Sequence, residues 1–122
     1  METSLALTII GTILTLVGVI FNAIPVLVNK QIMGDLAEEA INPAAALRTV
    51  LGGTAIAVGF IALYCRGLPY EQASILLIAL GVGMIVIMST IILIKPRGFA
   101  DAIPIPPVVM FVILTIIAFY AS

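Results

Sequence analysis

The chain has 122 residues, of which 63% are hydrophobic and only 9% are charged. Soluble domains are about 45–50% apolar and about 25% charged, so this composition excludes a soluble globular domain and indicates an integral membrane protein. The net charge of −1 provides no basic surface for nucleic acid, and the absence of histidine removes the commonest general base and transition-metal ligand.

Four long apolar runs occupy most of the sequence. They predict membrane-spanning helices at about residues 4–28, 44–64, 73–94 and 108–120, because the hydrocarbon core of a bilayer requires about 20 apolar residues per helix. A helix satisfies its backbone hydrogen bonds internally, whereas a closed barrel needs about eight strands. The sequence therefore predicts an all-α, integral membrane four-helix bundle that forms a single transmembrane domain over residues 1–122.

The first apolar run is expected to remain in the protein as a membrane anchor. Glu2 is the only charged side chain before it, so the run lacks the basic n-region of a signal peptide, and its apolar part is too long for an h-region. Pro25, near the end of the run, is expected to kink the helix and to free a backbone carbonyl that Asn22 can occupy.

Three connections join the predicted spans. Residues 29–43 are expected to contain a short interfacial helix that Asn42 and Pro43 end. Residues 66–72 form a tight turn, in which Arg66 and Glu71 are expected to make an exposed charge pair of little energetic value. Residues 95–107 contain four prolines and one glycine, which exclude a regular helix. The last two of these prolines are expected to form the first turn of the fourth span.

Small residues predict where the helices contact one another. Helices in lipid associate through close backbone approach, because no hydrophobic driving force acts between them. The expected contact positions are Gly11, Thr15 and Gly18 in the first span, Gly52, Gly53, Ala55 and Gly59 in the second, and Ala79, Gly81 and Gly83 in the third.

The basic residues predict the orientation in the membrane. The first and third connections share one side and carry Lys30, Lys95 and Arg97, whereas the second carries only Arg66. The positive-inside rule places the first and third connections in the cytoplasm and both termini outside. Aromatic residues at the opposite span ends agree with an interfacial belt, namely Tyr64, Tyr70 and Tyr120.

Arg48 is the candidate site residue, since it is the only charged side chain inside a predicted span. A charge at bilayer depth costs at least about 2.5 kcal/mol. One interpretation is an anionic partner: a lipid phosphate, a carboxylated substrate or an acidic residue of another subunit. The alternative is that the side chain reaches the interface and pairs locally with Asp35, Glu38, Glu39 or Asp101.

No residues form a recognisable catalytic, cofactor-binding or metal-binding arrangement. Glu38 and Glu39 are adjacent, so on a helix they point about 100° apart and cannot share a proton. The single Cys65 excludes an internal disulfide and a CxxC pair. Serine and threonine side chains in the spans have no base beside them and are expected to bond back to their own helix.

The run NPAAALRTVLGGTAIAVG resembles the second span of the DoxX-like superfamily of four-helix bacterial membrane proteins, in its uncharacterised branch. The matching residues are Asn42, Arg48, Gly52, Gly53 and Gly59. The resemblance implies a single four-helix bundle in a bacterial membrane. Some members of the superfamily are tied to thiosulfate–quinone oxidoreduction, but this chain supplies no redox residues for that activity.

We expect a non-catalytic accessory or scaffolding subunit of a larger photosynthetic or respiratory membrane complex, with the lipid bilayer and other membrane subunits as partners. The expected location is the bacterial inner membrane. One alternative is a small homo-oligomeric transporter, although transport of a charged solute requires an ionisable residue near the midplane. Another is the membrane subunit of a DoxX-like quinone-linked oxidoreductase, which requires a cofactor-bearing partner chain.

Overall fold

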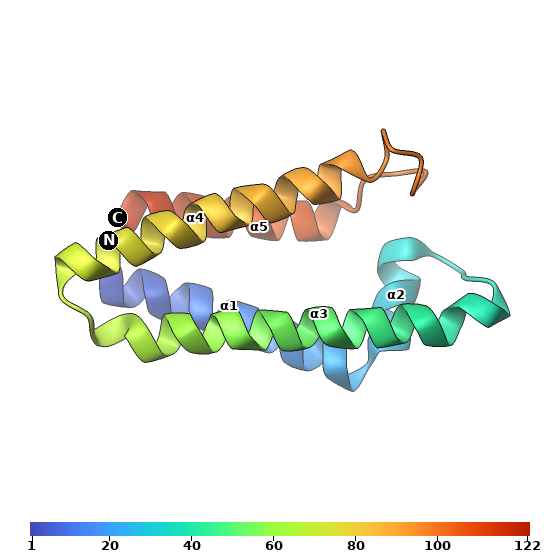
Figure 1. The fold of residues 1–122 in the computed structure, drawn as a ribbon, viewed down its shortest axis with the longest axis horizontal. Helices are drawn as coiled ribbons and strands as arrows, with labels where there is room; N and C mark the ends of the chain where they lie inside the picture. The colour runs from blue at the N-terminus through green and yellow to red at the C-terminus, as the bar shows by residue number, and fades with distance from the viewer. The chain divides into compact units, whose positions relative to one another are not determined.

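The computed structural model describes all 122 residues, and every regular element in it is helical (Figure 1). This confirms the all-α prediction. The elements are α1 (Thr3–Ala23), α2 (Pro25–Met33), α3 (Glu38–Tyr64), the 3₁₀ turn η1 (Cys65–Gly67), α4 (Tyr70–Leu93) and α5 (Ile105–Ala121).

Three of the helices, α1, α3 and α4, are long and apolar enough to cross a membrane. Helix α5 has 17 residues, which correspond to about 25 Å, and is therefore short for a hydrocarbon core of about 30 Å. Prolines occupy its first turn as expected, since the missing N–H groups have no helical partner there. The fourth membrane span, and with it the four-helix membrane bundle, stays a prediction.

The chain divides into two compact units, which consist of residues 11–64 and of residues 1–10 with 65–122. The boundary falls inside α1, so the first turns of this helix belong to one unit and the rest to the other. The single transmembrane domain stays a prediction.

Within residues 11–64, the first predicted span is interrupted by Pro25. Helix α1 ends at Ala23, Ile24 has non-helical dihedrals (φ −137°, ψ 55°), and α2 begins at Pro25. The expected kink is thus a complete break, because proline at the first helical position loses no hydrogen bond. The Asn22 amide donates to the Gly18 carbonyl at 2.9 Å, one turn before it, rather than to a group freed by the proline.

The second predicted span begins earlier than expected. Helix α3 starts at Glu38 and includes Pro43, so the interfacial helix ending at Pro43 is wrong. The predicted connection, residues 29–43, consists instead of the end of α2, a bend at residues 34–37 and the first turns of α3. Gly34 ends α2 with a φ of 77°, a conformation that glycine adopts without steric cost. Glu38 and Glu39 stabilise the start of α3 through the helix dipole.

In the other unit, α4 and α5 pack side by side (Figure 1). The buried residues of each helix recur every three or four positions and so form one face. A side chain at Gly81 would lie 2.8 Å from the Phe119 ring, which shows how close the two helices are. Buried positions are Ala73, Leu77, Gly81 and Met84 on α4 and Leu114, Ala118 and Ala121 on α5.

The connections of this unit agree in part with the sequence. Residues 95–104 form turns and bends without a regular helix, as the prolines predicted. Arg66 and Glu71 are both exposed and form no ion pair with each other, so the predicted charge pair is wrong. The Tyr70 hydroxyl donates to the Ser122 carbonyl at 3.1 Å, which ties the start of α4 to the end of α5.

Candidate functional site

A close contact between α1 and α3 supports the candidate site within residues 11–64. A Cβ on Gly59 would lie 2.8 Å from the Gly11 carbonyl oxygen, and a Cβ on Gly18 would collide with the Gly52 carbonyl oxygen. The seven-residue spacing on each helix puts both contacts on one stripe, because seven residues are nearly two turns. These four glycines confirm the predicted contact. Gly53 in α3 and Gly83 in α4 were predicted wrongly, since a side chain at either position would meet no atom within 4 Å.

Thr15 lies in this contact, and its buried hydroxyl has no hydrogen-bond partner. Thr15 and the exposed Thr12, which donates no hydrogen bond, are exceptions among the serine and threonine residues of the spans. The prediction that such side chains bond to their own helix is confirmed for Thr8, Thr54, Ser89, Thr90 and Thr115.

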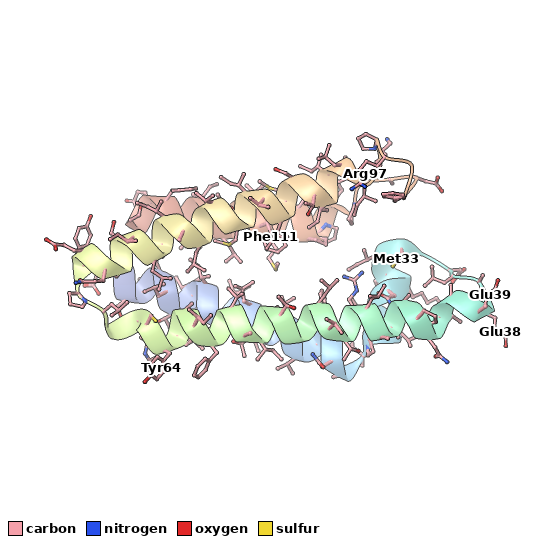
Figure 2. All side chains as sticks on the ribbon, viewed as in Figure 1. Met33, Glu38, Glu39, Tyr64, Arg97 and Phe111 are labelled. Carbon is pink, nitrogen blue, oxygen red and sulfur yellow. The ribbon has the colours of Figure 1, made fainter.

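Arg48 is bound by side chains of α1 and α2. Its Nε donates to Asn29 Oδ1 at 2.7 Å, and its Nη2 lies 3.9 Å from the Met33 sulfur. The guanidinium carbon stands 5.0 Å from the centroid of the Phe21 ring, within cation–π distance. Met33 marks the end of α2 in Figure 2. The site therefore surrounds a cation with an amide, a thioether and an aromatic face.

The structure contains no ion pair between Arg48 and Asp35, Glu38 or Glu39, which corrects the expected local pairing. The two glutamates are exposed at the start of α3 (Figure 2). Because α3 begins earlier than predicted, Glu38 lies about 15 Å from Arg48 along the helix axis. The role of Arg48 in binding a partner or lipid stays a prediction.

Asn29 is the residue that sequence reasoning missed. Only 2% of it is exposed, although it lies in a segment expected to be a connection. Its Oδ1 accepts from the Arg48 Nε, which fixes the orientation of the amide because that nitrogen is only a donor. The Asn29 Nδ2 is buried and has no hydrogen-bond partner. The only sequence signal was an amide directly after an apolar run.

A pocket of about 250 Å³ is bounded by α2, the bend after it and the start of α3. Its polar lining comes from Asn29, Lys30 and Asp35. The lining thus offers an amide and an ammonium as donors and a carboxylate as acceptor, which is an arrangement suited to binding. No group of three or more histidine, cysteine, aspartate or glutamate side chains is placed to hold a metal ion.

In comparisons with known proteins, no family model, curated protein or solved structure matched the chain. The resemblance of residues 42–59 to the DoxX-like superfamily therefore stays a prediction. Within that stretch, Gly52 and Gly59 contact α1, whereas Arg48 binds the amide of Asn29.

Proposed function

We propose that this protein is a small, non-catalytic membrane protein that acts as an accessory or scaffolding subunit of a larger photosynthetic or respiratory complex. The supporting observation is a pair of exposed small-residue faces. Gly53 and Ala57 on α3 are exposed four residues apart, as are Ala79 and Gly83 on α4. Such pairs allow the backbone of another membrane helix to approach closely.

The complex should survive purification from native membranes in mild detergent without crosslinking, and the change Gly83→Leu should release it. A leucine at this position projects into open space in the chain alone, so it leaves the fold intact while it blocks helix docking. Size-exclusion chromatography with mass spectrometry measures the release. Val82→Leu is the matched control, because Val82 is exposed on the same helix and is already apolar.

The composition of the purified particle distinguishes the proposed function from its alternatives. A larger assembly of other membrane subunits supports the accessory role. A particle that contains only two copies of this chain favours a transporter, and a co-purifying redox enzyme favours the DoxX-like role. Retention of the whole assembly by Gly83→Leu and by Gly53→Leu contradicts docking at these faces.

For the orientation, we propose a bacterial inner-membrane protein whose residues 29–43 and 95–107 face the cytoplasm. In a Cys65→Ser background, a cysteine replacing Asp35 should react with a membrane-impermeant maleimide only after the cells are permeabilised. A cysteine replacing Leu68, in the exposed turn on the opposite side, should react in intact cells. The reverse labelling pattern would invert the assignment.

A further inference from the structure

One residue that lines the pocket between α2 and α3 has an unused hydrogen-bond donor. Asn29 lines this pocket and is 2% exposed, and its Nδ2 has no partner. Arg48 cannot accept a bond from it, because a guanidinium carries only donors. Buried polar groups in folded proteins are nearly always paired, so this nitrogen indicates that the pocket accommodates an acceptor group of a ligand.

The pocket also presents one charge of each sign. Lys30 and Asp35 line it without forming an ion pair with each other. A ligand that carries both an anionic and a cationic group can therefore engage both side chains at once. Apolar side chains complete the lining, namely Val26, Leu36 and Ile41.

We propose that this pocket binds the phosphoethanolamine headgroup of a membrane phospholipid. The phosphate accepts hydrogen bonds from Asn29 Nδ2 and the Lys30 ammonium, and the primary ammonium of the headgroup donates to Asp35. The volume of about 250 Å³ is below the range of about 300–1,000 Å³ for drug-sized ligands, so it suits a headgroup whose acyl chains remain outside. Arg48 acts as a positioning residue, because its bond to Oδ1 keeps Nδ2 available as a donor.

The location of the pocket favours a lipid as the source of this headgroup. Helix α2 directly follows α1, and α3 carries the pocket residue Ile41 shortly before its apolar stretch. Both α1 and α3 are long and apolar enough to cross a membrane. The pocket therefore lies near the ends of two membrane-crossing segments, which is where phospholipid headgroups are found.

The lining also distinguishes ethanolamine from other headgroups. A quaternary ammonium such as choline has no N–H to donate and is typically recognised by aromatic cages. The pocket lining contains no aromatic side chain. A glycerol headgroup carries no cation and leaves Asp35 without a partner. Phosphatidylethanolamine is therefore the preferred occupant.

The test uses the full chain in mild detergent with equal amounts of phosphatidylethanolamine, phosphatidylcholine and phosphatidylglycerol. Native mass spectrometry measures how much of each lipid remains bound. Phosphatidylethanolamine should be retained about fivefold more than either competitor, which is the effect expected of one solvent-exposed charge pair. Equal retention of the three lipids overturns the proposal.

Two variants assign the contacts. Asp35→Asn should remove the preference for phosphatidylethanolamine over phosphatidylcholine, and Lys30→Gln should weaken the retention of both lipids about fivefold without changing their ratio. Glu39→Gln is the control for Asp35→Asn, because it makes the same charge change at an exposed position outside the pocket. If either pocket variant retains the lipids in the same amounts as the parent protein, the assignment of the contacts is contradicted.

A competition experiment distinguishes a bound lipid from a soluble zwitterionic ligand. Free phosphoethanolamine should displace the lipid only at about a hundredfold excess or more, because it lacks acyl chains to bury. Displacement at equal concentration would assign the pocket to a soluble ligand and overturn the lipid assignment. The experiment uses the purified chain alone, so its outcome is independent of the proposed accessory role.

Discussion

Replacing Gly59 with leucine should separate α1 from α3 and lower the free energy of unfolding by about 3 kcal/mol. A Cβ at this position would lie 2.8 Å from the Gly11 carbonyl oxygen and 2.9 Å from the Thr15 backbone nitrogen. Backbone atoms cannot rotate out of the way as a side chain can, so the helices themselves must move. Overpacking of a core typically costs about 1–3 kcal/mol, and a contact with backbone belongs at the upper end.

Unfolding of the purified chain by sodium dodecyl sulfate, followed by circular dichroism, measures this effect. Gly53→Leu is the matched control, because it makes the same change on the same helix where no atom lies within 4 Å. It should leave the free energy of unfolding unchanged or raise it by up to about 1 kcal/mol, because leucine forms a helix more readily than glycine. Equal losses in the two variants would contradict the assignment of the loss to the α1–α3 contact.

The bond between Arg48 and Asn29 should appear as a strong coupling between two substitutions. Asn29→Leu removes the 2.7 Å bond from the arginine and should cost about 1.5–3 kcal/mol, the usual value for a hydrogen bond to a charged group. Arg48→Leu leaves the buried Asn29 amide with neither of its atoms paired and should cost about 1–3 kcal/mol.

The double variant Asn29→Leu, Arg48→Leu should be more stable than the sum of the single losses predicts. Replacement of both partners by apolar groups leaves no polar atom unpaired and can be nearly neutral. The expected coupling is about 1–3 kcal/mol, which the same unfolding assay resolves. Purely additive losses would mean that the bond contributes nothing to stability.

The helical content of this fold was predictable because long apolar runs permit little else in a membrane. The helix ends were less predictable. Pro25 and Pro43 both lie near predicted helix boundaries. Helix α2 begins at Pro25, whereas α3 continues through Pro43. A proline near a helix start removes few hydrogen bonds, so sequence alone does not decide between the two outcomes.

The glycine contact shows a signal that the sequence does contain. Adjacent residues on a helix point about 100° apart, so Gly52 and Gly53 cannot both face α1. The seven-residue spacing from Gly52 to Gly59 matches that from Gly11 to Gly18 and selects the correct member of the pair. The matching seven-residue spacing of the glycines was therefore a better predictor of the helix contact than the number of small residues.

The candidate site was predictable only in part. Arg48 stood out because a charge inside an apolar run is rare. Asn29 did not, because an amide at the end of such a run is usually solvated. Its burial depends on α2 packing against α3 (Figure 1), a contact between segments separated in the sequence that no local pattern reports.

The paired glycines also determine where this chain tolerates insertions and deletions. One extra residue between Gly11 and Gly18, or between Gly52 and Gly59, rotates everything beyond it by about 100° and moves one glycine out of the contact. An equal insertion in both segments does not restore the contact either, because both helices then turn. The turns at residues 95–104 have no such requirement. Homologous chains should therefore keep the length of the two glycine segments constant and vary in length at these turns.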